Sequence, residues 1–294
     1  MKDDFYNYRL RKGYAVKTIK TQNSYLNRFK SWLIIKNLRI ENLNSENLLE
    51  CLSWFREKSG ESIASSRNCL QAIRLYLDYQ MENGVIEHNP AFVIKLRYGG
   101  DRAKAQPLPS KTMEAIYRWF APLKYKTNRE NIVHQRDIAV LGLLLFQGLD
   151  SGDLERLRVK NIDLHKGTVY VPSSRSNAAR KLKLESVQIL PVQNYLLKVR
   201  TKVLRYQQGS DKLFPQSKMQ DIVSRLVERI KKQYPEVEGS RHIRSSVIMN
   251  WLRTDHIRQV QYMAGHRRVS STERYRNEDL HDLAGQLKKY HPMK

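Results

Sequence analysis

The stretch Gly265–Tyr275 reads GHRRVSSTERY, and it places a Gly-His pair nine positions before a tyrosine that lies between two arginines. A glycine is typical of the left-handed residue that ends an α-helix, so we expect His266 to lie on a tight turn. Ser270 or Ser271 is a suitable opening residue for a short helix that carries Tyr275. The pattern therefore predicts that His266 and Tyr275 belong to two successive helical elements.

A second segment, RHIRSSVIMNWL at Arg241–Leu252, adds an arginine to this pair. Its apolar residues recur with the period of an α-helix, and Arg244 stands at the start of that apolar pattern. We therefore expect Arg244, His266 and Tyr275 to converge on a single phosphate.

These three residue types are the ones needed to cut a DNA phosphodiester through a covalent intermediate. A phenol with a pKa of about 10 leaves more easily than an alkoxide, so a strand joined to tyrosine can be resealed. A guanidinium binds the charged phosphoryl oxygens, and a histidine or lysine can protonate the departing sugar oxygen. Each residue also has a simpler interpretation: Tyr275 as an exposed anchor, His266 as a helix C-cap, and Arg244 as a surface charge.

The charge of the whole chain indicates the class of partner. Its 294 residues include 53 lysines and arginines against 29 acidic residues, a formal net charge of +24. Such an excess favours nucleic acid. Solubilising surface charge and an anionic membrane are the alternatives, but no basic amphipathic helix with a lipid-facing stripe stands out. The longest apolar stretch, Ala139–Phe146, is too short to span a bilayer.

Other features of the composition narrow the setting and the chemistry. Cys51 and Cys69 are the only cysteines, which argues against a disulfide framework and fits a reducing cytoplasm. The N-terminus has no apolar core of a signal peptide, so we expect a cytoplasmic protein. Metal-ligand spacings, clustered carboxylates and Gly-rich phosphate loops are missing from the sequence, and we expect no metal and no cofactor.

The first third of the chain predicts a helical domain. Apolar residues recur at helical spacing in Tyr25–Leu33 and in Leu70–Leu77. The second of these helices is expected to end at Asn83-Gly84, where glycine provides a left-handed cap. Residues 97–106, RYGGDRAKAQ, lack periodicity and predict a linker. The predicted domains are therefore residues 1–96 and residues 107–294.

The second domain predicts a mixed composition. Ser110 is the expected N-cap of its first helix, and an apolar helix over Asp137–Gln147 is expected to end at a glycine. Thr168–Val171 and Arg180–Leu184 predict two short strands around the polar turn SSRSNAAR. Helical spacing resumes after residue 219. The predicted fold class is mainly α with a small β element (α+β).

The segment that contains Arg244, Gly265-His266 and Tyr275 resembles the catalytic domain of tyrosine recombinases (phage-type integrases). The signature of that family runs H-x-x-R, then G-H or G-W, then the nucleophilic tyrosine nine residues after the histidine or tryptophan. The three elements named here fall at the arginine, the G-H pair and the nucleophile.

Upstream segments extend the resemblance over nearly the whole chain. FQGLDSGDLERL at Phe146–Leu157 is similar to the family's T-G-L-R-x-x-E-L, and KNIDLHKGTVYV at Lys160–Val171 is similar to the stretch that leads into its β-hairpin. The pattern T-x6-Y-x3-F at Thr18–Phe29 and the pair Asn89-Pro90 resemble the family's helical core-binding domain.

The chain departs from the family pattern at two sites around the central arginine. Asp150 stands where the family has its first catalytic arginine, and Arg241 stands at the histidine of H-x-x-R, with His242 one position later. The simpler interpretation of Asp150 is that it caps a helix that begins near Ser151. An aspartate facing a phosphate is repulsive, and one arginine contact is worth about 10³–10⁵ in rate in phosphoryl transfer. Asp153 matches the acidic residue that braces the family's site, and it also suits the first turn of a helix.

The hairpin departs as well, because Arg175 aligns best with the family's hairpin lysine, although Lys181 and Lys183 lie close by. Together with Arg180, these residues have a simpler interpretation as a solvated turn that contacts phosphates. The resemblance implies a set of catalytic residues: Tyr275, Arg244, His266, Arg241, Arg175 and Asp153.

The resemblance implies a C-shaped clamp on double-stranded DNA, made of a SAM-like helical core-binding domain and a mixed catalytic domain. It implies site-specific recombination or integration through a 3′-phosphotyrosyl link, for a bacterial mobile element, by a homo-tetramer with accessory proteins. It also implies a location on the bacterial nucleoid. The tail after Tyr275 suits docking onto a neighbouring subunit or onto its own domain. The alternatives are a catalytically impaired or inactive DNA-binding relative and a type IB topoisomerase.

Overall fold

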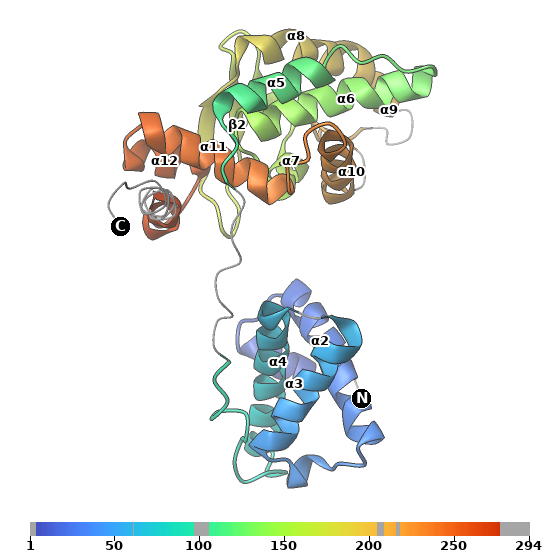
Figure 1. Ribbon diagram of the computed structural model, residues 1–294, viewed down its shortest axis with the longest axis vertical. Helices are drawn as coiled ribbons and strands as arrows, with labels where there is room; N and C mark the ends of the chain where they lie inside the picture. Colours follow the sequence, from blue (N-terminus) through green and yellow to red (C-terminus); the bar gives the residue numbers. More distant parts are fainter. Residues whose placement is uncertain (1–3, 61, 97–105, 205–208, 216–217, 277–294) are drawn as a thin grey trace, which may run out of the picture. The chain divides into compact units, whose positions relative to one another are not determined.

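The computed structural model describes residues 4–60, 62–96, 106–204, 209–215 and 218–276, with only the backbone of residues 203 and 204. The chain divides into two compact units, Met1–Lys104 and Ala105–Lys294, each largely helical (Figure 1). Nearly all of the predicted linker lies outside the described residues, and so does nearly all of the tail after Tyr275 that is expected to dock. The domain limits at residues 96 and 107 stay a prediction.

The described part of the first unit is a group of helices around one apolar core. Both apolar stripes predicted from the sequence face this core, including Phe29 and Trp32 of one helix and Ile73 of another. Asn44 caps one helix by accepting from the backbone N–H of Asn47 at 2.9 Å. The elements are α1 (Asp4–Arg11), α2 (Val16–Ile35), η1 (Ile40–Asn42), α3 (Ser45–Ser59) and α4 (Ile63–Glu82).

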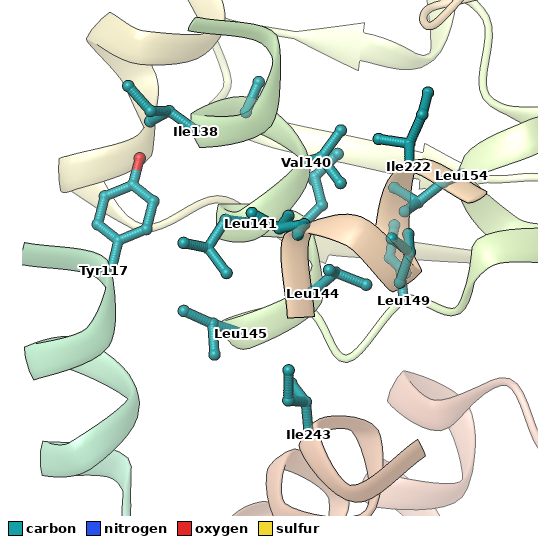
Figure 2. Close-up of a cluster of buried hydrophobic side chains, with 14 of the residues drawn as sticks. Tyr117, Ile138, Val140, Leu141, Leu144, Leu145, Leu149, Leu154, Ile222 and Ile243 are labelled. Atoms are coloured by element: carbon teal, nitrogen blue, oxygen red, sulfur yellow. The ribbon is translucent and has the colours of Figure 1, made fainter. Parts of the chain in front are cut away.

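The second unit is built around helix α6 (Asn128–Leu145), which is buried on nearly every side along its second half. Figure 2 shows Leu141, Leu144 and Leu145 of this helix among side chains from other elements, such as Ile222 and Ile243. An all-round apolar helix of this kind is stable only inside a core. The other helical elements of this unit are α5 (Ser110–Phe120), α7 (Ser151–Arg156), η2 (Val159–Asn161), α8 (Ser186–Asn194), the π-helical η3 (Tyr195–Val199), α9 (Arg200–Leu204), α10 (Met219–Lys231), α11 (Ser240–Thr254) and α12 (Ile257–Ala264).

A small antiparallel sheet completes the second unit, in the order β1 (Ile162–Asp163), β2 (Thr168–Val171) and β3 (Arg180–Lys183). Val169 pairs with Leu182, and Val171 pairs with Arg180. Alternate residues of β3 point to opposite faces, so Arg180 and Leu182 are buried while the two lysines of the strand are exposed. The predicted hairpin and the mainly α fold with a small β element are confirmed.

Three predicted helix starts differ from the structure. Helix α6 begins at Asn128 and not at Asp137, because its first half is polar. Helix α5 begins with Ser110 itself, and Pro109 occupies the capping position.

Helix α11 begins at Ser240, so Arg244 lies in its second turn and not at its start. The first three residues of α11 are polar, and the apolar periodicity by which the sequence indicates a helix begins only at Ile243.

The end of the described chain has the predicted turn at Gly265-His266 and the predicted helix around Tyr275. Helix α12 ends at Ala264, and Gly265 takes a left-handed conformation with a φ of 74°. Residues 270–276 form a further helical segment that carries Tyr275. Within the described residues, no helix combines the length and the apolar character that crossing a membrane requires.

Candidate active site

The N-terminus of α7 places two aspartates side by side. Asp150 caps this helix, because its Oδ1 accepts a hydrogen bond from the backbone N–H of Asp153 at 2.8 Å. Its carboxylate is thereby held against the start of its own helix, in agreement with the predicted capping role. Position 150 therefore contributes negative charge close to the site, where the family pattern has an arginine.

Asp153 is fully buried and accepts from three arginines of different elements. Arg180 of β3 donates to Oδ2 at 2.7 Å and Arg156 of α7 donates to Oδ1 at 2.7 Å, while Arg244 of α11 lies 3.5 Å from Oδ2. Burial acts to raise the pKa of the Asp153 carboxyl, but the guanidinium groups of Arg180, Arg244 and Arg156 outweigh it and lower that pKa. The ionised carboxylate thus links α7, α11 and the sheet.

Arg244 connects this carboxylate to the turn that carries His266. Its Nη2 donates to the carbonyl oxygen of Ala264 at 2.9 Å, and its Nη1 donates to that of Gly148. The side chain is 13% exposed. Arg244 is therefore held at a fixed position between the segment that follows α6 and the end of α12. Its partner Ala264 immediately precedes the Gly265-His266 pair.

His266 is partly buried and lies among arginines. Its Nδ1 is 2.8 Å from Oγ1 of Thr272. Burial lowers the pKa of this imidazole to about 4, and the charges of Arg244, Arg180 and Arg274 contribute to the shift. At neutral pH the ring is therefore uncharged, and it can donate or accept a hydrogen bond but adds no positive charge.

Tyr275 lies directly against His266. The two rings are parallel to within 9°, with their centroids 5.9 Å apart. The tyrosine ring also packs on a small apolar cluster that includes Ile248 and Val260. These contacts place the phenol at a defined position beside the imidazole, so Arg244, His266 and Tyr275 lie in one region of the second unit.

The hairpin is tied to the same turn by backbone hydrogen bonds. The N–H of Ala178 donates to the carbonyl of Gly265 at 2.8 Å, and the N–H of Lys181 donates to the hydroxyl of Tyr262 at 2.9 Å. Arg267 donates to the carbonyl of Ser174 at 2.8 Å. The tip of the hairpin is therefore held next to His266, although the two segments lie far apart in the sequence.

A cavity of about 420 Å³ opens beside Tyr275. No acidic side chain is among the described residues that surround it, so the cavity is strongly basic. A phosphate group has the charge and hydrogen-bonding capacity to occupy such a space. The residues around it are Arg175, Ser176, Asn177, His266, Arg267, Arg268, Ser271, Arg274 and Tyr275.

The other residues predicted for the site lie in different environments. Arg175 is exposed and borders the cavity, but Lys181 and Lys183 lie on the exposed face of β3 and do not. Arg241 is exposed at the start of α11, and in the described part of the chain no hydrogen bond or ion pair joins it to Arg244 or His266.

His242 has a structural role. The backbone N–H of Glu238 donates to its Nδ1 at 3.3 Å, so Nε2 carries the proton and donates to the carbonyl of Gln106 at 2.8 Å. The histidine is buried, and its hydrogen bond to Gln106 anchors the first described residues of the second unit. It is thus not available to replace the missing histidine of H-x-x-R.

Arg180 is a residue of the site that the sequence did not identify as one. Its interpretation as part of a solvated turn is wrong for this residue, because the side chain is only 1% exposed and pairs with Asp153. The register of the hairpin contained a signal, since Arg180 shares the inward parity of Leu182 on β3. That signal depends on knowing which face of the strand is buried.

The chain matches the model of the phage integrase family over residues 124–281, more than half of its length, and it belongs to this family. The match confirms the resemblance drawn from the Arg, Gly-His and Tyr spacing. It begins before α6 and extends past the last described residue.

Curated and structural relatives agree with this assignment. The chain is 25% identical over 287 residues to tyrosine recombinase XerD of Pseudomonas aeruginosa, covering 92% of each chain. Its fold is similar to that of the XerH site-specific recombinase bound to a palindromic difH substrate in a post-cleavage complex, with a TM-score of 0.69, 19% identity, and coverage of 91% of this chain and 78% of XerH. It is also similar to the Tn1549 transposon integrase in complex with a circular intermediate DNA, with a TM-score of 0.66, 16% identity and 92% of each chain covered.

Proposed function

We propose that the protein catalyses site-specific DNA recombination through a 3′-phosphotyrosyl intermediate, for a bacterial mobile element. The observation that carries the proposal is the position of Tyr275, stacked on His266 at the edge of a cavity lined by arginines. The names of the relatives, tyrosine recombinase and site-specific recombinase, support the same reaction class.

In the proposed reaction, the phenolic oxygen of Tyr275 attacks the scissile phosphorus. The bond from phosphorus to the 5′ oxygen breaks, the phenol loses its proton, and the 5′ oxygen gains one. Arg244 stabilises the charge on the nonbridging oxygens, and neutral His266 donates a hydrogen bond to one of them. Attack by the 5′-hydroxyl of a second strand reverses these changes and releases the tyrosine, so the energy of the phosphodiester is conserved.

The tip of the hairpin provides the proton for the departing 5′ oxygen. Arg175 borders the cavity and is the best placed hairpin cation, whereas Lys181 and Lys183 lie on the exposed face of β3 and do not border the cavity. A guanidinium is a weaker acid than an ammonium group, so this step is slower than it is with a lysine at position 175.

We propose that the chain acts on double-stranded DNA as a homo-tetramer, with accessory proteins, at the bacterial nucleoid. Basic residues of both units grip the phosphates of the duplex. The relatives solved with difH and with a circular intermediate DNA support a DNA substrate. Arg241 remains a predicted participant that acts when DNA brings the start of α11 against a phosphate.

The covalent intermediate can be tested with nicked suicide DNA that carries the ends of the element. The unchanged chain is expected to form an adduct that survives denaturation, and Tyr275→Phe is expected to form none, because it lacks the nucleophilic oxygen. Tyr170→Phe is the matched control, since Tyr170 is an exposed tyrosine of β2 outside the cavity. An adduct that persists in Tyr275→Phe contradicts the proposed nucleophile.

A non-catalytic DNA-binding relative is the second candidate, and the observation that favours it is Asp150 at the position of an arginine. This candidate predicts specific DNA binding with a steep dependence on salt and no adduct on any substrate. The same suicide DNA therefore separates the two functions.

A further inference from the structure

Arg180 has more hydrogen-bonding capacity than its surroundings use. Its Nη2 donates to Asp153, but Nε and Nη1 are closed to solvent and have no acceptor within the described residues. Buried donors of a charged group are costly to leave unpaired, and a site that keeps them this way commonly awaits a ligand.

The charge around Arg180 is also unbalanced. Arg156, Arg180 and Arg244 surround Asp153, and within the described residues Asp150 is the other carboxylate whose charge acts on Arg180. Three guanidinium groups face two carboxylates, and two of the three, on Arg180 and Arg244, are largely buried, so the cluster keeps a net positive charge. An anion is the partner that such a cluster lacks.

The position of Arg180 places this unused capacity next to the reacting residues. A side chain on Gly265 would meet Nη1 of Arg180, since a Cβ there would lie 2.6 Å from it. Arg180 therefore packs on the turn that presents His266, while Arg244 holds the same turn through Ala264. The charge of Arg180 also reaches His266, whose pKa it helps to lower.

We propose that Arg180 supplies the second guanidinium of the phosphate site, in place of the arginine that position 150 lacks, with Nη1 as the donor to a nonbridging oxygen of the scissile phosphate. This inference rests on the proposed recombinase function. Because Nη1 is buried against Gly265 in the DNA-free chain, the contact requires the hairpin tip to shift from the Gly265 turn when DNA binds.

Two features make β3 a suitable source for this group. Arg180 is held at Nη2 by Asp153, which leaves Nη1, on the side of the guanidinium that faces Gly265, for a phosphate oxygen. The same carboxylate positions Arg244, so the two arginines share one anchor and keep a constant separation.

The experiment measures single-turnover adduct formation on nicked suicide DNA with either a normal scissile phosphate or a methylphosphonate. The methylphosphonate replaces one nonbridging oxygen by a methyl group and removes the negative charge. Arg180→Gln is expected to slow the normal reaction by about 10³-fold or more, but to differ little from the unchanged chain on the methylphosphonate. Equal losses on both substrates would show that Arg180 only supports the structure, and would overturn the proposal.

A second set of variants tests the replacement directly. Asp150→Arg in the Arg180→Gln background is expected to raise the rate of adduct formation at least about tenfold over Arg180→Gln alone. The same change in the unchanged chain is expected to have a much smaller effect. An equal gain in both backgrounds contradicts the proposal. Ser151→Arg is the matched control, since it adds an arginine to the same helix end one position away.

Folding is monitored by thermal unfolding of every variant. If Arg180→Gln does not fold, Arg180→Lys replaces it, because lysine keeps the charge but loses the planar fork. Arg180→Lys is then expected to lower the rate of adduct formation about tenfold or more on the normal phosphate, and not on the methylphosphonate. An unchanged chain that forms no adduct on either substrate contradicts the recombinase function, and the inference with it. An active chain that tolerates Arg180→Gln contradicts the inference only.

Discussion

His266 shows how the surroundings of one residue set its chemistry. The spacing to Tyr275 located it, but the sequence did not predict that it is uncharged at neutral pH. Burial comes first among the causes of its low pKa, and the neighbouring arginines add to it. A neutral imidazole is suited to hydrogen bonding in the transition state, whereas in the proposed reaction the arginines supply the positive charge at the phosphate.

The low pKa of His266 predicts a specific dependence of stability on pH. The folded chain binds this proton only near pH 4, whereas the unfolded chain binds it near the ordinary histidine value of about 6.5. Stability from the neutral imidazole is therefore complete above the unfolded value and is lost as the pH falls towards 4. His266→Asn removes this contribution.

The measurement is denaturant unfolding of both chains at several pH values between 4 and 7. The free energy of unfolding is expected to fall more steeply with acidification in the unchanged chain than in His266→Asn. His134, which is also buried with a lowered pKa, titrates in both chains and cancels from the comparison. Parallel curves for the two chains would contradict the assignment.

At the scale of elements, the hairpin and the turn that follows α12 are held together and border the same cavity. The hydrogen bond from Ala178 to Gly265 joins the two, and Arg175 at the tip borders the cavity. The sequence predicted both strands, because alternation and turn residues are local signals. It did not predict the attachment to α12, which depends on the packing of segments that are distant along the chain.

The proposed proton transfer predicts that Arg175→Ala is rescued by a better leaving group. On normal DNA this variant is expected to form the adduct about 10²- to 10⁴-fold more slowly. With sulfur in place of the scissile 5′ oxygen, the departing thiolate needs no proton, and the variant is expected to approach the rate of the unchanged chain. Arg175→Lys is expected to be at least as fast as the unchanged chain, since an ammonium group is the stronger acid.

Arg267→Ala is the control for this prediction. Arg267 borders the same cavity but is held by the carbonyl of Ser174. Its loss weakens phosphate binding alone, so sulfur at the scissile position is expected to bring no rescue. If Arg175→Ala behaves in the same way, then Arg175 binds phosphate and does not donate the proton.

At the scale of the whole molecule, the net charge of +24 determines how DNA binding responds to salt. Each neutralised phosphate releases counterions, and the slope of log K against log salt is about −0.9 per contact. The four arginines around the cavity alone predict a slope of about −4 or steeper. Basic residues elsewhere on the chain make it steeper still.

Arg268→Gln is expected to reduce the magnitude of this slope by about 1 and to weaken binding uniformly across DNA sequences. Binding isotherms at several salt concentrations provide the measurement. Arg118→Gln is the matched control, because Arg118 of α5 already pairs with Glu114 and lies outside the cavity. An unchanged slope in Arg268→Gln would show that this face does not contact the DNA backbone.

Local sequence patterns were sufficient to predict the helical periods, the hairpin, the caps at Asp150 and Gly265, and the spacing that identifies the family. All of these depend on neighbouring residues or on a fixed separation along the chain. The burial of Arg180 against Asp153, the structural role of His242 and the exposure of Arg241 became known only from the folded chain. Burial and pairing join residues of different elements, and the periodicity of one segment does not indicate which partner another segment brings to it.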